Sequence, residues 1–141
     1  MIFMKNHLVK YSYRVVVLFS VIYFISSCSG ETSFAKVMSQ SSNELNKSCP
    51  MMVDKDTRLD NAIAIEDKTF QYNYTLINLN KSTLDIENFR SYMKPIIVNS
   101  VSSNPDLKIY RDNNVTMSYY YKDKNGEFLT KIEVTPELYS E

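Results

Sequence analysis

Alternation of apolar and polar residues in several short stretches constrains the fold of this chain more than any other feature. In residues 69–78 the apolar positions are Phe70, Tyr72, Tyr74 and Leu76. A period of two places successive side chains on opposite faces of a β-strand. The stretch therefore predicts a strand with one buried face and one face in water, as in an antiparallel sheet. Residues 57–66 predict a preceding strand, joined to it by a turn at Asp67 and Lys68.

The C-terminal third predicts a β-hairpin. Residues 115–122 alternate in the same way, and the Asn125-Gly126 pair that follows is a strong signal for a turn between two strands. Residues 128–134 are the return strand in this interpretation. Its alternation assigns one face to Phe128, Thr130, Ile132 and Val134, and the other face to Leu129, Lys131 and Glu133.

Apolar residues at helical spacing predict two helices. The first covers residues 33–47, and the second covers residues 82–102. Ser82 and Asp85 have the spacing of a capping box, which indicates that Ser82 is the N-cap of the second helix. Pro95 lies inside this helix and predicts a kink or a split into two pieces.

The elements follow one another as helix, strands, helix and hairpin. A helix with one apolar stripe and a sheet with one apolar face bury these surfaces against each other. We therefore expect an α+β fold, with two helices on one face of an antiparallel sheet of about four to five strands. A single domain would cover residues 34–141. Cystatin-like and NTF2-like folds pack helices on an antiparallel sheet in this way and serve as analogies.

The first 27 residues predict an export signal. Residues 1–14 contain three basic residues and no acidic one, residues 15–25 are apolar, and two serines follow. This order is typical of a secretory signal peptide. A membrane-spanning helix needs about 20 apolar residues, so the apolar run is short for a span. An uncleaved membrane anchor is the alternative.

Residues 25–28, Ile-Ser-Ser-Cys, resemble the bacterial lipobox, whose cysteine becomes the N-terminus of a lipoprotein. The resemblance implies a diacylglycerol on the sulfur of Cys28 and a third acyl chain, such as palmitate, on its amine, which together anchor a protein stably. Residues 28–33 would then be the lipidated cysteine and a tether. Ser29, in a position where Asp marks the inner membrane, implies the periplasmic side of the outer membrane. The alternative is an ordinary secreted protein, cut elsewhere, with Cys28 in a disulfide.

Charge and composition argue against several classes of protein. Three of the 16 Lys and Arg residues, and none of the 16 Asp and Glu residues, lie in the predicted signal peptide, so the rest carries a net charge of −3 and is a poor nucleic-acid binder. His7 is the only histidine and leaves with the signal, which removes Ser-His-Asp, Cys-His and His-ligated zinc sites. The two glycines, Gly30 and Gly126, form no phosphate loop. We therefore predict no cofactor, no metal and no enzymatic activity.

An acidic cluster raises the question of calcium: Asp54, Asp56 and Asp60. An EF-hand loop that began at the first of these would need glycine at position 59 and glutamate at position 65, where the chain has Leu59 and Ile65. We interpret the cluster as a solvated turn with Arg58 as its counterion.

Tyrosine is abundant, with 11 residues, and three of them are adjacent at 119–121. Alternation sends Tyr120 to the face opposite the core, beside Gln71 or Asn73 if the two strands pair. An exposed tyrosine offers apolar area with a polar tip, so these three residues are a candidate partner-binding surface. The alternative is that aromatic residues suit strands and face water without a role.

Cys49 is the remaining cysteine. In an oxidising compartment it would form a disulfide or stay as a free thiol, and lipidation of Cys28 would remove its only intramolecular partner. A nucleophilic role needs an activating base, and no histidine is available for it.

Three segments, residues 49–60, 70–78 and 121–128, resemble a group of small, uncharacterised bacterial exported proteins. The resemblance covers most of residues 34–135 and implies no activity. Its members often carry a second cysteine late in the second helix, where this chain has Val101-Ser102-Ser103.

These observations favour a bacterial lipoprotein with a non-catalytic domain that binds a protein or a ligand in the cell envelope. Its expected partners are the membrane, through the anchor on Cys28, and an envelope protein. The alternative is an inhibitor or immunity-type protein that blocks a toxin or a hydrolase. An enzyme that uses paired carboxylates comes third, because the sequence shows no obvious pair.

Overall fold

The computed structural model describes residues 30–66 and 68–140. From Ser33 onward these residues belong to one compact unit, Ser33–Glu141. The predicted signal peptide, Cys28 and Asp67 lie outside the described residues. Among the helices of the described part, none has the length and apolar character needed to cross a membrane.

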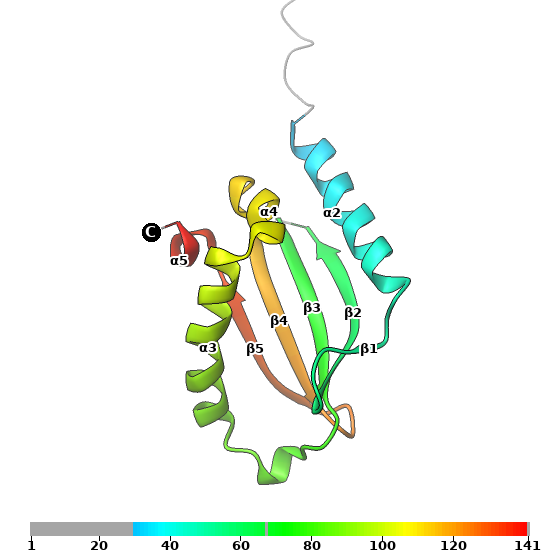
Figure 1. The fold of residues 1–141 in the computed structure, drawn as a ribbon, viewed down its shortest axis with the longest axis vertical. Helices are drawn as coiled ribbons and strands as arrows, with labels where there is room; N and C mark the ends of the chain where they lie inside the picture. Colours follow the sequence, from blue (N-terminus) through cyan, green and yellow to red (C-terminus); the bar gives the residue numbers. More distant parts are fainter. Residues whose placement is uncertain (1–29, 67, 141) are drawn as a thin grey trace, which may run out of the picture. The chain divides into compact units, whose positions relative to one another are not determined.

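The chain alternates between helices and strands (Figure 1). The elements are α2 (Gly30–Asn46), β1 (Met51–Met52), β2 (Thr57–Ile65), β3 (Thr69–Leu76), the 3₁₀ helix η2 (Lys81–Thr83), α3 (Ile86–Ser103), the 3₁₀ helix η3 (Pro105–Leu107), α4 (Lys108–Asp112), β4 (Thr116–Asp123), β5 (Phe128–Val134) and α5 (Pro136–Tyr139). The predicted α+β class, helix order and strand positions are confirmed. The short helices η2, η3, α4 and α5 were not predicted.

The five strands form one sheet in the order β1-β2-β3-β4-β5. All neighbouring strands are antiparallel except β3 and β4, which are parallel. The prediction of a purely antiparallel sheet is therefore wrong. The long connection through α3 returns the chain to the starting end of β3, and only such a crossover can join parallel neighbours. Alternation within a strand carries no information about the direction of its neighbour.

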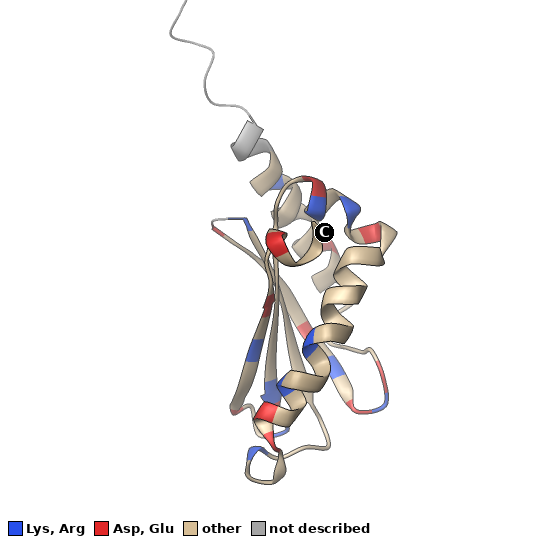
Figure 2. Cartoon of the chain, turned by 90° about the vertical axis from the view of Figure 1, so that its left-hand side faces the viewer, with Lys and Arg blue, Asp and Glu red and all other residues tan. Residues whose placement is uncertain are grey.

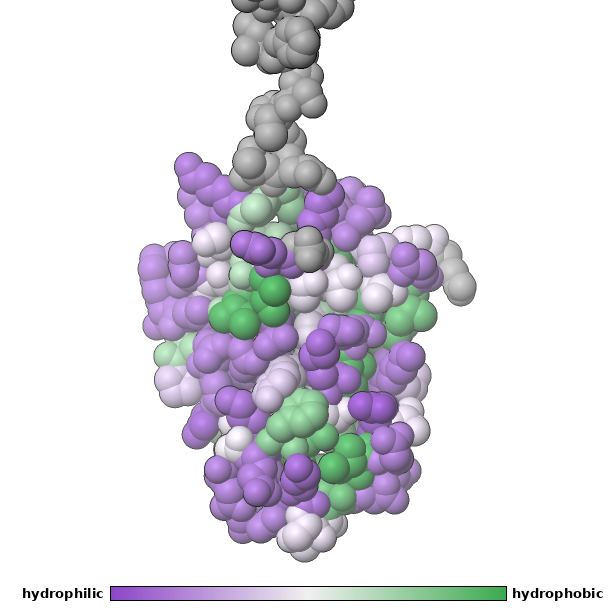
Figure 3. Space-filling model, turned by 180° about the vertical axis from the view of Figure 1, so that it is seen from behind, coloured by the Kyte–Doolittle hydropathy of each residue, from purple (hydrophilic) through white to green (hydrophobic). Residues whose placement is uncertain are grey.

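The helices lie on one face of the sheet, with α2 beside β2 and α3 beside β5 (Figure 1). The view from the side shows that no helix of the described residues covers the opposite face (Figure 2). We call this second face the open face. Seen from behind, it is mainly hydrophilic with scattered hydrophobic residues (Figure 3).

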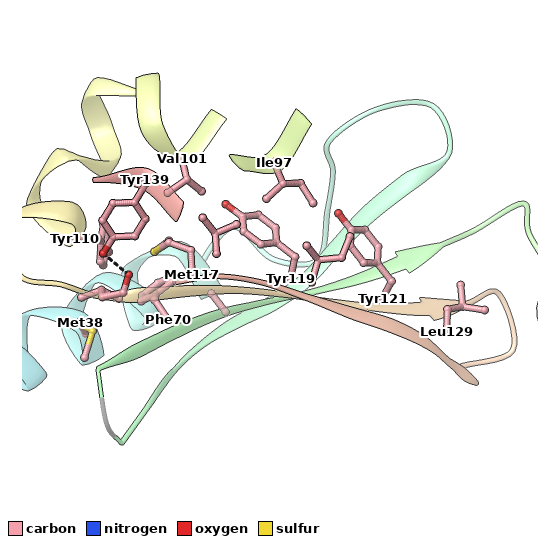
Figure 4. Close-up of a cluster of buried hydrophobic side chains, with 14 of the residues drawn as sticks. Met38, Phe70, Ile97, Val101, Tyr110, Met117, Tyr119, Tyr121, Leu129 and Tyr139 are labelled. Carbon is pink, nitrogen blue, oxygen red and sulfur yellow. Dashed lines mark hydrogen bonds between the residues drawn. The ribbon is translucent and has the colours of Figure 1, made fainter. Parts of the chain in front are cut away.

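The hydrophobic core lies between the sheet and the helices (Figure 4). Phe70 from β3 and Met117 from β4 are almost completely buried, and Val101 from α3 packs with them in the same core. At the end of the core, the hydroxyl of Tyr139 donates a hydrogen bond of 2.8 Å to the carbonyl of Val115. The strand side chains that were predicted to face the core thus pack against the apolar side of α3.

The helix boundaries differ from those predicted in three ways. Helix α2 begins at Gly30, so residues 30–33 are helical and are not part of a tether. Asp85 is the N-cap of α3 and accepts a hydrogen bond from the backbone N–H of Asn88, whereas Ser82 lies in η2. Helix α3 also continues through Pro95 as one element, so of the two predicted effects, a kink or a split, the split is wrong.

A bulge in β5 corrects the predicted faces of two residues. Tyr121 pairs with Thr130 and Lys122 pairs with Phe128, which leaves Leu129 as an extra residue. The extra residue reverses the alternation at the start of the strand. Leu129 is therefore buried and Phe128 is exposed, opposite to the prediction, whereas Thr130 keeps its predicted side.

One edge of the sheet is closed by a side chain of α2. The amide of Asn46 donates to the carbonyl of Ala62 at 2.8 Å and accepts from its N–H at 2.7 Å. Ala62 lies on β2 beyond the short partner strand β1 and is fully buried. The Asn46 amide thus takes the place of a neighbouring strand at the β2 edge.

Replacement of Asn46 by alanine is expected to lower the free energy of unfolding by about 2 kcal/mol, because a buried N–H and a buried C=O lose their partners. Thermal or urea denaturation of the variant measures this loss. Asn43→Ala is the control, since Asn43 is exposed on the same helix. Equal losses in the two variants would contradict a role for Asn46 at the edge.

Candidate functional site

The structure brings the predicted trio Tyr120, Gln71 and Asn73 together on the open face. Asn73 is the register partner of Tyr120 in the parallel β3–β4 pair, and Gln71 lies two residues away on β3. The Gln71 amide donates to Asn73 Oδ1 at 2.8 Å, and the Asn73 amide donates to Asn61 Oδ1 at 2.6 Å. The predicted placement is confirmed. A binding role for the three residues stays a prediction.

An aromatic pair lies next to these amides. The rings of Tyr120 and Phe128 have centroids 4.8 Å apart, and Lys122 Nζ lies 5.8 Å from the Tyr120 ring. Phe128 is 45% exposed. A large apolar side chain on an otherwise polar face is a typical anchor for a protein partner. Sequence alternation missed Phe128, because the bulge that exposes it is not visible in the pattern.

A pocket of about 250 Å³ lies between α3 and the outer strand of the sheet. We call it the β5 edge pocket. It is lined by Arg90 and Lys94 from α3 and by Lys131, Ile132 and Glu133 from β5. Figure 2 views this side of the domain and shows basic positions on the helix and on the strands. Three cations and one carboxylate give the pocket an excess of positive charge.

The cations of the pocket are held in different ways. Lys131 Nζ pairs with Glu133 Oε1 at 2.7 Å, so these two charges compensate each other. Arg90 donates through Nε to the hydroxyl of Thr130 at 3.1 Å, and its Nη1 lies 3.7 Å from Glu87 Oε1. Lys94 makes no hydrogen bond or ion pair with any residue of the described part. The pocket thus offers one fixed guanidinium and one uncompensated ammonium group.

Sequence reasoning did not find Arg90 and Lys94. Their i, i+4 spacing places both side chains on one side of a helix, and this was the available signal. That α3 lies beside β5 depends on the crossover between parallel strands, which the sequence analysis did not predict. The five lining residues therefore could not be assembled into one site from the sequence.

The carboxylates that stand out in the structure stabilise turns. Asp54 accepts two backbone N–H bonds of 2.8 Å, from Asp56 and Thr57, and these bonds lower the pKa of its carboxyl. Arg58 pairs with Asp60 at 2.7 Å, as predicted, but both residues lie in strand β2, so the predicted turn includes only Asp54 and Asp56 of the cluster. Within residues 30–66 and 68–140, no group of three or more acidic, Cys or His residues could hold a metal ion.

Asp123 has a similar structural role at the β4–β5 turn. Burial raises the pKa of its carboxyl, but hydrogen bonds from the backbone N–H groups of Lys81, Glu127 and Asn125 lower it by more. Gly126 follows at a φ of 83°, a conformation that favours glycine. The turn predicted from Asn125-Gly126 is therefore confirmed, with Asp123 as its central acceptor.

Four tyrosines form a cluster on the helix-facing side of the sheet: Tyr72, Tyr74, Tyr119 and Tyr121. Ring centroids are 5.5 Å apart for Tyr72 and Tyr119, and 5.4 Å apart for Tyr74 and Tyr121. Burial raises the pKa of all four phenols, and that of Tyr121 reaches about 12. The four rings pack against one another and against the core, and the cluster serves packing.

Cys49 is a half-buried free thiol. Burial raises its pKa, and the charge of Asp60 adds to the effect. A thiol with a raised pKa is a poor nucleophile. Within the described residues Cys49 has no disulfide partner, and the predicted alternative of a disulfide stays a prediction.

Comparison with protein families gives a match over most of the domain. The model of a domain of unknown function, DUF8479, matches residues 33–130. The chain belongs to the DUF8479 family. No curated protein matches its sequence.

Solved structures share the fold at low sequence identity. A Pseudomonas aeruginosa protein described as secreted (PA3611) matches with a TM-score of 0.64 and 13% identity, over 79% of this chain and 98% of its own. The pilotin EpsS of the type 2 secretion system of Vibrio vulnificus matches with a TM-score of 0.60 and 9% identity, over 77% and 93%. The type II secretion system pilotin AspS of Vibrio cholerae matches with a TM-score of 0.55 and 15% identity, over 76% and 93%.

Proposed function

We propose that this DUF8479 protein is a lipid-anchored, non-catalytic protein of the bacterial envelope whose domain binds another envelope protein. The observation that carries the proposal is the fold, which covers 93% of two type II secretion pilotins and 98% of a protein described as secreted. The lipobox resemblance at residues 25–28 supports the anchor. The excess of positive charge in the β5 edge pocket and the exposed Phe128 support protein binding.

The chemistry of the described residues also favours binding over catalysis. Asp54 and Asp123 are engaged by backbone N–H groups in turns. The tyrosine cluster packs in the core, and the Cys49 thiol has a raised pKa, which makes it a poor nucleophile. Asp54, Asp123 and the tyrosines therefore serve the fold. Lys94 of the β5 edge pocket and the exposed Phe128 remain open to a partner.

The inhibitor or immunity-type hypothesis stays a prediction, since no contact in the domain favours it.

A crosslinked pull-down from native membranes tests the proposed function. The tagged full-length chain is crosslinked in intact cells, isolated with its membranes and analysed by mass spectrometry, with Cys28→Ser as the control. We expect acylation of Cys28 and one dominant envelope protein, lost in the control. A protein that stays in the membrane fraction without Cys28 would contradict the lipid anchor. Turnover of a substrate that depends on a carboxylate would contradict the non-catalytic assignment.

A further inference from the structure

We propose that the β5 edge of the sheet receives an extended, acidic segment of the partner protein as a sixth strand. The proposal deepens the proposed function, because it names the surface and the kind of segment that the partner supplies. It rests on three observations. The N–H and C=O groups of alternate β5 residues point outward, and Asn46 occupies the backbone groups of Ala62 at the opposite end of the sheet. The β5 edge pocket carries an excess of positive charge.

At the β5 edge, the N–H and C=O groups of alternate residues point away from the sheet. The N–H of Asp123 donates to the carbonyl of Glu127, which shows that this position of β4 faces β5, whereas the N–H of Thr116 donates toward β3. Successive residues of a strand alternate in direction, so odd-numbered residues of β4 face β5. Their partners Thr130 and Ile132 then face β4. Lys131 and Glu133 therefore direct their N–H and C=O groups to the outer edge.

The two ends of the sheet differ in whether their outward backbone groups are bonded. At the β2 edge, Asn46 occupies the N–H and the C=O of Ala62. At the β5 edge, the described residues supply no strand and no side chain to the backbone of Lys131 or Glu133. An edge with unpaired N–H and C=O groups is a template for another strand. The β5 edge thus offers free backbone groups to which a strand can be added, whereas at the opposite end Asn46 occupies those of Ala62.

The pocket beside this edge indicates the chemistry of the added strand. Arg90 and Lys94 lie where the side chains of a strand paired with β5 would meet α3. Among the residues that the structure describes, the ammonium group of Lys94 has no partner, and the positive charges of the pocket lining exceed the negative ones. A carboxylate from the added strand would compensate this charge with short, charge-assisted hydrogen bonds. The fitting segment is therefore extended and carries Asp or Glu.

A second copy of this chain fits the edge less well. Two-fold pairing of β5 with β5 would bring Arg90 and Lys94 of both copies to one interface, where like charges repel. At the opposite end of the sheet, Asn46 already occupies the backbone groups of Ala62, which leaves less free backbone for β5 of another copy. For these reasons the proposal commits to a segment of a different protein.

The test uses a displayed library of random decapeptides as the probe and the full-length chain, purified from membranes in detergent, as the target. We expect enrichment of peptides with Asp or Glu among β-branched residues. Lys94→Ala should weaken binding of an enriched peptide by roughly tenfold, in the range of a lost charge-assisted hydrogen bond. Lys36→Ala is the matched control, because Lys36 is an exposed lysine on α2.

A pair of variants separates the backbone contact from the side chain. Lys131→Ala removes the charge, whereas Lys131→Pro also removes the N–H that points to the outer edge and leaves the β4–β5 bonds intact. The proline variant should bind roughly threefold to tenfold more weakly than the alanine variant. If the proline variant has lost its fold by circular dichroism, methylation of alternate amide nitrogens in the peptide tests the same backbone pairing from the other side.

Three outcomes would overturn the proposal. The first is no enrichment of acidic peptides. The second is equal binding of the peptide to the alanine and proline variants, together with no effect of peptide methylation, and the third is a dimer of the chain that Lys131→Pro dissociates. The last outcome would assign the edge to a second copy. The result of the pull-down, which tests the proposed function, does not depend on strand addition at β5. A membrane partner retained by Lys94→Ala and by Lys131→Pro would leave the proposed function intact and exclude strand addition at β5.

Discussion

Replacement of Phe70 by alanine is expected to reduce the free energy of unfolding by about 3–5 kcal/mol. Phe70 is 1% exposed, and its ring contacts Tyr110 and Tyr72 with centroids 5.0 and 5.2 Å away. Alanine leaves a cavity between β3 and the helices, and the packed neighbours cannot fill it without leaving their rotamers. Urea denaturation followed by circular dichroism measures the change in the free energy of unfolding.

Phe128→Ala is the matched control for this prediction. Phe128 is the same residue type in the same sheet, but it is 45% exposed and contacts Tyr120 on the open face. Its replacement should lower the free energy of unfolding by about 1 kcal/mol or less. If both variants lose the same stability, the core does not lie on the helix-facing side of β3, and the face assignment of the sheet is wrong.

The domain is also expected to lose its stability at alkaline pH, through the four clustered tyrosines. Burial raises the pKa of Tyr72, Tyr74 and Tyr119 above the usual value of 10, and that of Tyr121 to about 12. Protonation of the phenols therefore favours the folded state. The resulting contribution to the free energy of unfolding is fully present below pH 10 and is lost as the pH rises toward 12 and beyond. Each phenol contributes up to about 1.4 kcal/mol per pH unit in that window.

An alkaline titration with two detectors measures this effect. Tyrosinate absorbance reports ionisation and far-ultraviolet circular dichroism reports folding, and we expect the cluster to ionise together with unfolding. Tyr119→Phe removes one titrating group and should move the unfolding midpoint to higher pH, whereas Tyr92→Phe, at a position 68% exposed, should leave it unchanged. Ionisation of all tyrosines before any loss of structure would contradict burial of the cluster.

The sequence predicts those parts of the fold that depend on local periodicity. Strand β2 was expected over residues 57–66 and ends at Ile65, and the hairpin turn at Asn125-Gly126 is present. Parallel pairing of β3 with β4 depends on where α3 returns the chain, which periodicity does not encode. The bulge at Leu129 likewise depends on the pairing of two strands. Asp85 is the N-cap of α3, whereas the predicted cap Ser82 lies in η2, whose own N-cap Asn80 accepts from the backbone N–H of Ser82.

The candidate site also contains residues that local periodicity places and residues that only the tertiary arrangement brings together. Tyr120 and Asn73 could be placed on one face because alternation fixes the face, and the register of neighbouring strands then brings them together. The β5 edge pocket combines residues 90 and 94 with residues 131–133, and these meet only through the tertiary arrangement. Local sequence shows that each residue is basic or acidic. It does not show that they line one cavity.

The Asn46 amide at Ala62 limits how copies of this domain can assemble. A chain whose sheet has two open edges can bind one copy at each end, and repetition of that contact builds a fibre. Here Asn46 of α2 occupies the backbone groups of Ala62 at the β2 edge, so a strand that approaches this part of the sheet finds one position already bonded. Asn46→Ala would free these groups. Besides its cost in stability, this variant is therefore expected to form head-to-tail polymers more readily than the native domain.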